Sequence, residues 1–443
     1  MGIFKAYDIR GVYPTELDEE IARKIGTCAG KLIGGRTIGV GHDMRLSGEA
    51  LSDAVIDGLL RAGVNVIDLG AIATPMLTFS VVEYGFDGGV MVTASHNPKE
   101  YNGFKMVRKE GKPVGWDTGI AEIEKQVATL TKLPDRAPRA KVARRDSLGD
   151  YVDHLMSFVR GIKDITVAVD AAHGMAGLYM PKVFARLKAK LVPLYFNLDG
   201  SFPDHGPNPM EAENLEDLQH AIREQHADVG IALDADADRV VFIDEQARPI
   251  PCDLIIALLA KEALSEHPGQ AVVYDVRSSW AVREEIAALG GKPVMGRVGH
   301  SFMKALLRET NGVLAGELSG HYYFRDNHFA DDGAIAAIKV LNLLCRERKA
   351  LSELVRPLQR YAASGEINSD VPDKDAKIAE VKAKFGQGGR IVELDGLSVE
   401  FADWWFNIRP SNTEPKLRLT VEAKTKPLME QKRDGLLSVI RAK

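Results

Sequence analysis

Three short segments rich in β-branched residues, each ending in an aspartate, constrain the fold of this chain more than any other feature. They are Thr37–Asp43, Ile165–Asp170 and Ala271–Asp275. A small or polar turn and a helix-like segment follow each of them, at 48–62, 177–188 and 278–289. Apolar strands of this kind are typical of buried parallel sheets, and their alternation with helices indicates βαβ units. The repetition therefore predicts three related α/β domains.

The remaining sequence predicts a fourth domain and places the boundaries. A length of 443 residues favours three or four domains. Residues 131–146 are polar, charged and contain prolines, so they are predicted to form a connector. Alternating apolar residues near the C-terminal end predict a smaller α+β domain, closed by a helix from about Pro427. The predicted domains are 1–145, 146–247, 248–361 and 362–443.

Composition narrows the classes of partner. A net charge of -5 and an isoelectric point near 6.2 argue against a nucleic-acid binder, which usually carries a basic face. No run of about 18 apolar residues is present, so we expect no membrane span. Cys28, Cys252 and Cys345 lie far apart and match neither a disulfide framework nor a metal-ligand spacing. We therefore expect a cytoplasmic protein that binds neither nucleic acid nor a membrane. Our further expectation is a monomer or weak homodimer with a small-molecule partner, which this composition allows.

The segment Thr93–Pro98 follows directly on the apolar run Gly89–Val92, so a buried strand is predicted to present Ser95 in the loop at its end. Ligands bind at strand ends in α/β proteins. A serine hydroxyl is a weak nucleophile that needs a neighbouring base, a cation or an attached phosphoryl group. Lys105 is a candidate to neutralise such a group or to move a proton. A plain surface turn is the alternative, since Ser, Asn and Pro are common turn residues.

Three carboxylates at a spacing of two, Asp234, Asp236 and Asp238, lie between two apolar runs. Hard anionic oxygens packed this closely repel one another unless a hard cation such as Mg²⁺ holds them. A calcium loop of the EF-hand type is excluded, because Arg239 stands where glycine is required and both flanks are predicted strands. A solvated acidic turn remains the alternative. The pattern favours a metal site on an extended loop.

Two further turns carry polar side chains that suit a phosphorylated polyol. Arg409–Pro415 combines a planar guanidinium with Ser, Asn and Thr donors, and turns of this kind often bind anions. Gly316–His321 places Glu317, Ser319 and His321 between glycines, where a carboxylate could accept paired sugar hydroxyls. Each turn could also serve as a plain polar connection. His300, Tyr7 and Arg10 are weaker candidates of the same kind.

Taken together, five motifs resemble those of the α-D-phosphohexomutase superfamily, in its phosphomannomutase/phosphoglucomutase branch. They occur in the family's order over essentially the whole chain, as Tyr7–Gly11, Thr93–Pro98, Asp234–Arg239, Gly316–His321 and Arg409–Pro415. The resemblance implies a four-domain α/β architecture, with three related α/β domains and a C-terminal α+β domain around a central cleft.

The resemblance also implies an activity: reversible phosphoryl transfer between the 1- and 6-positions of mannose and glucose phosphates. The implied intermediates are a phosphoserine enzyme and a hexose 1,6-bisphosphate, with Mg²⁺ as cofactor and the bisphosphate as activator. The implied metal ligands are Ser95, as its phosphoserine, and Asp234, Asp236 and Asp238. The implied catalytic residues are Ser95, His96, Lys105, Arg10 and Arg239. The implied substrate-binding residues are Tyr7, Arg277, His300, Glu317, Ser319, His321, Arg409, Ser411, Asn412, Thr413 and Arg418.

Some positions depart from the family's pattern. Ala235 and Ala237 stand in the metal loop where many relatives have glycine, so a shift in the loop geometry is expected. Arg277 replaces a frequent lysine, which affects the sugar contacts expected from the third domain. Asn412 stands where the phosphoglucosamine branch has glycine, and that branch is the nearest alternative.

Overall fold

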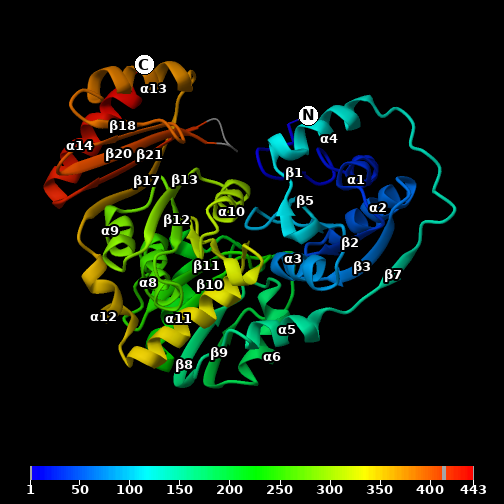
Figure 1. Ribbon diagram of the computed structural model, residues 1–443, viewed down its shortest axis with the longest axis horizontal. Helices are drawn as coiled ribbons and strands as arrows, with labels where there is room; N and C mark the ends of the chain where they lie inside the picture. Colours follow the sequence, from blue (N-terminus) through cyan, green and yellow to red (C-terminus); the bar gives the residue numbers. More distant parts are fainter. Residues whose placement is uncertain (1, 412–415, 443) are drawn as a thin grey trace.

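The computed structural model describes residues 2–411 and 416–442, and it contains four units that are each built on a separate β-sheet (Figure 1). In Figure 1 the chain runs from domain I on the right, through domains II and III, to domain IV at the upper left. The predicted four-domain α/β architecture is confirmed. Within the described ranges, no helix is long and apolar enough to cross a membrane.

Domain I has a seven-stranded sheet in the order β1-β5-β4-β2-β3-β7, with β6 paired to β5. Its strands are β1 (Ile9–Val12), β2 (Thr37–His42), β3 (Asn65–Ala71), β4 (Gly88–Val92), β5 (Tyr101–Arg108), β6 (Lys112–Pro113) and β7 (Val142–Arg144). Its α-helices are α1 (Glu19–Ile33), α2 (Gly48–Arg61), α3 (Thr74–Glu83) and α4 (Ile120–Thr129).

Domain II has a four-stranded sheet in the order β11-β10-β8-β9. Its strands are β8 (Lys163–Asp170), β9 (Lys188–Leu194), β10 (Val229–Leu233) and β11 (Val240–Asp244). Its α-helices are α5 (Leu148–Met156), α6 (Ala176–Phe184) and α7 (Glu216–Gln225).

Domain III has a five-stranded sheet in the order β13-β12-β14-β15-β16. Its strands are β12 (Ala271–Asp275), β13 (Lys292–Gly296), β14 (Leu314–Gly316), β15 (Tyr322–Phe324) and β16 (Ala330–Asp331). Its α-helices are α8 (Cys252–Glu266), α9 (Trp280–Ala288), α10 (His300–Glu309), α11 (Gly333–Glu347) and α12 (Leu351–Val355).

Domain IV is an antiparallel sheet in the order β17-β21-β20-β19-β18 with two helices. Its strands are β17 (Ala362–Asp370), β18 (Arg390–Val392), β19 (Leu397–Glu400), β20 (Trp404–Pro410) and β21 (Lys416–Ala423). Its helices are α13 (Lys374–Phe385) and α14 (Lys426–Ile440), the second of which begins one residue before the predicted start.

The three repeated aspartates have one structural role in common. Asp43, Asp170 and Asp275 are buried at the ends of β2, β8 and β12. Each accepts a hydrogen bond at its Oδ1 from the backbone N–H two residues further on, at 2.8–3.0 Å. A short acidic side chain that binds its own following turn in this way ends the strand and turns the chain toward the helix. The repeated aspartate therefore shapes the loops in which the candidate site residues lie.

The predicted connector contains one strand that the sequence analysis missed. β7 pairs in parallel with β3 at the edge of the domain I sheet, through Val66 and Val142. All three of its residues are exposed. An edge strand with no buried face carries no alternating pattern, so its polar composition resembles that of a loop.

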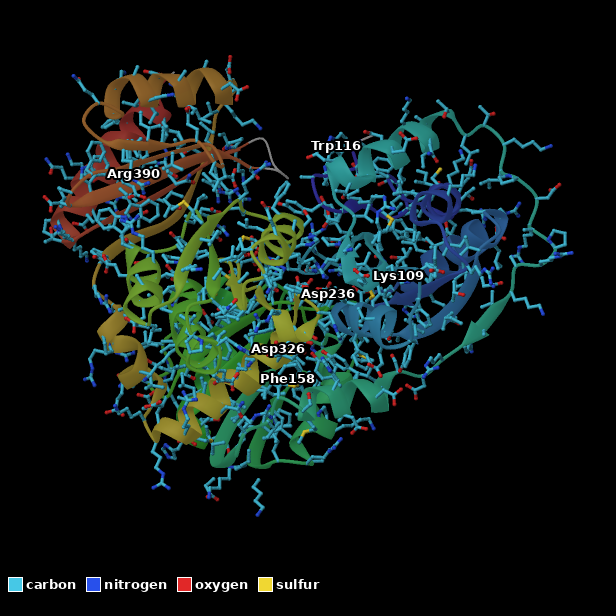
Figure 2. All side chains as sticks on the ribbon, viewed as in Figure 1. Lys109, Trp116, Phe158, Asp236, Asp326 and Arg390 are labelled. Atoms are coloured by element: carbon cyan, nitrogen blue, oxygen red, sulfur yellow. The ribbon has the colours of Figure 1, made fainter. Side chains whose placement is uncertain are left out.

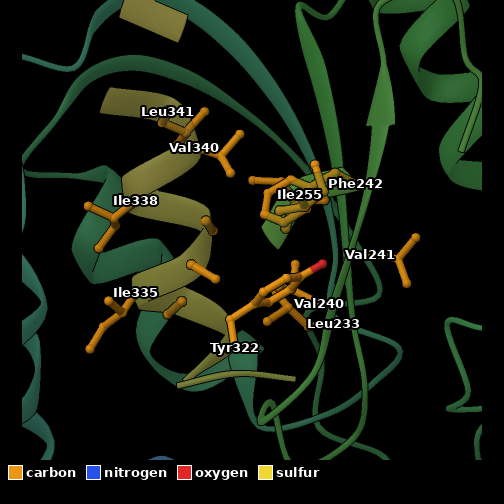
Figure 3. Packing of buried hydrophobic residues seen from close by; sticks show 14 of the residues in the cluster. Leu233, Val240, Val241, Phe242, Ile255, Tyr322, Ile335, Ile338, Val340 and Leu341 are labelled. Carbon is orange, nitrogen blue, oxygen red and sulfur yellow. The ribbon is translucent and has the colours of Figure 1, made fainter. Parts of the chain in front are cut away.

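The hydrophobic clusters show which domains share a core. A single buried cluster extends from α3 of domain I through domains II and III. Figure 3 shows α11 of domain III beside β11 of domain II, with Val340 and Phe242 in this cluster. Domain IV has a separate core, made only of residues between Val371 and Ile440. Domain IV is therefore the unit that can change position without opening a shared core.

A buried hydrogen bond joins domains II and III, and its removal gives a stability prediction. Tyr151 of α5 donates to Asp332 Oδ2 at 2.7 Å. Asp332 caps α11, because its Oδ1 accepts from the N–H groups of Ala334 and Ile335. Burial raises the pKa of Asp332 to about 7. Tyr151→Phe leaves a buried carboxyl oxygen without its donor, and we expect a loss of about 1–3 kcal/mol in the free energy of unfolding.

The pH dependence of that loss follows from the raised pKa. Because folded Asp332 holds its proton up to about pH 7, its contribution to stability declines as the pH rises from the ordinary carboxyl range toward 7. The unpaired oxygen is then charged, so urea denaturation should show a larger cost for Tyr151→Phe at pH 8 than at pH 5. Tyr84→Phe, which removes an exposed bond to Asp150, is the matched control and should change stability by less than about 0.5 kcal/mol. An equal effect of the two substitutions would contradict this account.

Candidate active site

The loop after β4 holds Ser95 in a fixed and strained conformation. Ser95 is fully buried and has a φ of 51°, in the left-handed region. Its N–H donates to Thr93 Oγ1 at 2.8 Å. Arg45, whose side chain is also fully buried, donates from one terminal nitrogen to the carbonyls of Ser95 and Asn97, both at 2.6 Å. The backbone around the serine is therefore fixed by groups from two loops of domain I.

The Ser95 hydroxyl points across the domain boundary. It donates to Asp234 Oδ2 of domain II at 2.8 Å. His96 Nδ1 lies 3.4 Å from Ser95 Oγ. Burial, followed by the positive charges of Arg239 and Arg10, lowers the pKa of His96 well below its usual value. The imidazole is therefore neutral at pH 7.

The acidic triplet forms a compact cluster on the turn between β10 and β11. Asp234, Asp236 and Asp238 are buried, and each offers a carboxylate oxygen within 4.8 Å of the others. Thr74, at the start of α3, anchors the turn to domain I. Its hydroxyl donates to Asp236 Oδ2 at 2.6 Å, and its N–H donates to the Asp236 carbonyl at 3.1 Å. Figure 2 shows Asp236 near the middle of the molecule.

The turn is tighter than the extended loop expected from the sequence. Ala237 has a φ of 61°, whereas Ala235 does not have a positive φ. The left-handed conformation costs an alanine roughly 1–2 kcal/mol relative to glycine. Ala237 is therefore held in a strained backbone conformation, whereas Ala235 is not strained in this way.

The charges in the cluster show that the triplet suits a cation. Lys105 Nζ donates to Asp236 Oδ2 at 2.7 Å and also contacts the Asp238 carboxylate. Burial and then the other two aspartates raise the pKa of Asp234 well above its usual value. Asp236 Oδ1 is buried and has no hydrogen-bond partner among the described residues, and the buried Asp238 Oδ1 has only a long contact of 3.4 Å with His321 Nε2. Unsatisfied carboxylate oxygens of this kind fit a hard metal ion.

Two arginines complete the positive surroundings of the serine. Arg10 donates from Nε to Asp8 Oδ2 at 2.7 Å and from a terminal nitrogen to Asn97 Oδ1 at 2.5 Å. The Arg239 N–H donates to Asp234 Oδ1 at 3.1 Å, and its Nε lies 3.7 Å from Asp234 Oδ2. With Lys105, these residues place three cations around one hydroxyl and three carboxylates.

The predicted sugar loop reaches the same cluster. A β-bridge joins His321 to Arg239, and His321 Nε2 lies 3.4 Å from Asp238 Oδ1. Ser319 Oγ is 3.1 Å from His321 Nδ1. Glu317 accepts from the Gly299 N–H at 2.7 Å and from the Tyr323 hydroxyl, so both of its oxygens are engaged within the protein.

His300 and Tyr7 lie at the edge of this loop. Their rings pack edge to face with centroids 5.3 Å apart, and the His300 and His321 rings lie 6.2 Å apart. Burial, followed by Lys304 and Lys105, lowers the pKa of His300 well below its usual value. The structure thus brings Tyr7 of domain I to the histidine pair of domain III.

Arg409 and Arg418, which were predicted to bind the substrate phosphate, form a second cluster with Arg277, which was predicted to contact the sugar. We call these three guanidinium groups and the Ser411 turn the phosphate grip. Arg277 of domain III and Arg409 and Arg418 of domain IV all donate to the carboxylate of Glu366, at 3.3, 3.0 and 3.1 Å. Arg277 also forms a two-point contact with Asp275. The Ser411 N–H donates to the Lys416 carbonyl at 2.8 Å. The predicted residues Asn412 and Thr413 lie outside the described residues.

Sequence reasoning missed three residues of these clusters. Arg45 holds the serine loop, Thr74 anchors the acidic turn and Glu366 gathers the arginines. Arg45 had a local signal, because it follows a strand-end aspartate as Arg277 does. Thr74 and Glu366 stand in no motif, and only the packing of separate domains brings them to the site.

Comparisons with known proteins agree with this fold and these clusters. Models of the phosphoglucomutase/phosphomannomutase family match the chain in four parts, as its α/β/α domains I, II and III at residues 1–133, 149–247 and 251–361, and its C-terminal domain at 366–437. Fold and site together define the class of phosphohexose mutases. The chain belongs to the phosphoglucomutase/phosphomannomutase family.

Individual relatives match over almost the full length. The chain is 41% identical over 452 residues to a phosphomannomutase of Salmonella typhimurium, covering 99% of this chain and 98% of that protein. It is 40% identical over 425 residues to a Xanthomonas campestris protein named phosphohexose mutases, covering 95% of each. A solved structure of a phosphoglucomutase/phosphomannomutase family protein from Burkholderia thailandensis has a TM-score of 0.91 at 34% identity, covering 99% of this chain and 97% of that one.

Proposed function

We propose that this chain interconverts the 1- and 6-phosphates of mannose and glucose through a phosphoserine at Ser95 and a hexose 1,6-bisphosphate. One observation carries the proposal: the buried Ser95 hydroxyl lies 2.8 Å from the first carboxylate of a metal-suited acidic triplet. Phosphoryl transfer depends on placement and on neutralisation of negative charge. Lys105, Arg10 and Arg239 provide that neutralisation around the serine.

The transfer itself is a simple exchange of oxygens on phosphorus. The bond from phosphorus to Ser95 Oγ breaks, a bond to a free sugar hydroxyl oxygen forms, and the hydroxyl gives up its proton. Lys105, which contacts the Asp236 carboxylate, is our first candidate to move that proton. His96, whose Nδ1 lies 3.4 Å from Ser95 Oγ, is the second candidate. Asp234, Asp236, Asp238 and the phosphorylated Ser95 would hold Mg²⁺. When bound, the ion would neutralise negative charge on the phosphoryl oxygens.

A second contact must hold the hexose while its two phosphates exchange roles. We propose that Arg277, Arg409, Arg418 and the Ser411 turn hold the phosphate that is not being transferred. Glu317, Ser319 and His321 would contact the sugar hydroxyls, and Glu317 can do so by exchanging its internal partners. Because domain IV has its own core, it can open to let the bisphosphate turn over and then close again.

A substrate panel tests this function. The purified protein, with Mg²⁺ and catalytic glucose 1,6-bisphosphate, should convert mannose 1-phosphate and glucose 1-phosphate to the corresponding 6-phosphates. Glucosamine 6-phosphate in the same assay separates the alternative, a phosphoglucosamine mutase. Turnover confined to the amino sugar, or no turnover of any of the three, would overturn the proposal.

Arg409→Ala tests the phosphate grip. The Arg409 side chain is only 3% exposed and already binds the Glu366 carboxylate, so its guanidinium group lies where a buried anion can bind. Loss of a charged hydrogen-bond donor costs about 1.5–3 kcal/mol, and we expect KM to rise about ten- to a hundredfold with a smaller change in kcat. Arg390→Ala is the control, since Arg390 is exposed on β18 and pairs with Glu400 outside this cluster. A fall in kcat at unchanged KM would contradict the assignment.

A further inference from the structure

Glu366 holds the three arginines that we assign to the substrate phosphate, although no sequence motif singles it out. It lies on β17, the first strand of domain IV. Its Oε2 contacts Arg277 and Arg409, and its Oε1 contacts Arg418. These are the bonds that a carboxylate or a phosphate makes with guanidinium groups. Glu366 therefore provides, from within the chain, the kind of negative charge that a ligand phosphate would bring.

The arginine cluster has guanidinium donors beyond those that Glu366 uses. Arg277, Arg409 and Arg418 share the single carboxylate of Glu366, and Arg277 also contacts Asp275. Burial alone would raise the pKa of Glu366, but the three arginines lower it to about 2, so it is charged throughout the working pH range. Arg409 Nε is buried and has no hydrogen-bond partner in the described part of the chain. An unused buried guanidinium donor, in a cluster whose other donors already bind one carboxylate, points to a second anion.

The cluster also joins two domains. Arg277 belongs to domain III, whereas Glu366 and the other two arginines belong to domain IV. A ligand phosphate that takes over some of these guanidinium donors must weaken their bonds to Glu366. Binding and release of the phosphate therefore change the ionic contact between Arg277 of domain III and Glu366 of domain IV. Domain IV is the domain that has its own core.

We propose that Glu366 is a resident anion of the phosphate grip, which holds its arginines together when no ligand is bound and competes with the ligand phosphate when one arrives. Glu366 is thus a positioning residue that limits phosphate affinity and promotes release of the bisphosphate for its turnover. This inference rests on the proposed function, because it assumes that a phosphosugar is the ligand of the arginine cluster.

The test measures binding in the absence of turnover. Glucose 6-phosphate is titrated by calorimetry into the full-length protein in EDTA at pH 8, where a phosphate monoester is a dianion because its second pKa is near 6. Glu366→Gln keeps the size of the side chain and removes its charge. We expect the Kd of the variant to fall about tenfold or more, because one unit of like charge beside the dianion is removed in a partly buried site. The difference in Kd between Glu366→Gln and the original protein should be smaller at pH 5, where the phosphate of the ligand carries a single charge.

Three control variants make the result specific. Glu400→Gln removes the same charge from another carboxylate between domains III and IV, which pairs with Arg283 and Arg390, and it should leave Kd unchanged. Glu366→Asp keeps the charge and should stay within about threefold of the original protein. Arg409→Ala should weaken, about ten- to a hundredfold, the binding that Glu366→Gln strengthens, and this opposite effect identifies the site.

The outcomes separate this inference from the proposed function. Equal or weaker binding by a folded Glu366→Gln protein would show that the carboxylate only orders the arginines, and it would overturn the competition. A folded protein is recognised by an unchanged circular dichroism spectrum and melting transition. Tighter binding without mutase turnover would support Glu366 while the proposed function failed. Mutase turnover by the original protein, together with an unchanged Kd for Glu366→Gln, would support the proposed function and overturn the competition by Glu366.

Discussion

Ser95→Ala is expected to abolish mutase turnover, with a fall in kcat of roughly 10⁴-fold or more, as for the loss of a covalent nucleophile in other enzymes. The hydroxyl lies 2.8 Å from Asp234 and 3.4 Å from His96, in a loop whose backbone is held by Arg45 and Thr93. Among the described residues, the only other side-chain hydroxyl that hydrogen-bonds to the acidic triplet is that of Thr74, which donates to Asp236. Removing the Ser95 oxygen therefore removes the proposed phosphoryl carrier and leaves the surrounding charges in place.

A matched control is available in the same domain. Ser80, on α3, is fully buried, and its Oγ has no hydrogen-bond partner among the described residues. Ser80→Ala should therefore keep both activity and stability. The readout is mutase turnover with both 1-phosphates in saturating bisphosphate. If Ser95→Ala retained activity within tenfold of the original protein, the assignment of the carrier would be wrong.

Asp236→Asn is expected to give the second largest effect, a loss of kcat of at least about 10²–10³-fold. The substitution removes one of the three charges proposed to hold Mg²⁺ and weakens the contact with Lys105. The fold should persist, because the amide oxygen can still accept from Thr74 and because like charges in the triplet repel one another less.

Measuring activity over a range of Mg²⁺ concentrations distinguishes the loss of a metal ligand at Asp236 from general damage to the active site. The Mg²⁺ concentration at half-maximal activity should rise for Asp236→Asn. Asp150→Asn, which changes an exposed carboxylate that accepts from Tyr84, should leave the titration unaltered. Equal activity and equal magnesium dependence of Asp236→Asn and the original protein would contradict the metal assignment.

The sequence was sufficient to predict the positions of the motif residues. Ser95 lies in the loop after β4, Asp234 in the loop after β10 and Arg277 in the loop after β12. Each of these strands is a buried run of mainly apolar residues. Because local chain order determines where a strand ends, these loops were predictable without knowledge of the domain packing. The resemblance of the motifs to a known family then supplied their expected roles.

Residues that act across domain boundaries were not predictable in this way. Thr74 reaches Asp236 over a separation of 162 residues, and Glu366 reaches Arg277 over a separation of 89 residues. Neither lies in a local pattern, since a threonine at a helix start and a glutamate in a strand are common. β7 escaped prediction for a different reason, because an exposed edge strand has no apolar face to reveal it.

The central claim is that Ser95 alternately carries and gives up a phosphoryl group, and intact-mass measurement tests it most directly. The protein is first incubated with glucose 1,6-bisphosphate, then freed of ligand, and then exposed to mannose 1-phosphate with Mg²⁺. We predict one added phosphoryl group on the peptide that contains Ser95, its disappearance during the exposure, and formation of mannose 1,6-bisphosphate. A protein that catalyses the isomerisation without ever carrying phosphate on Ser95 would contradict the account.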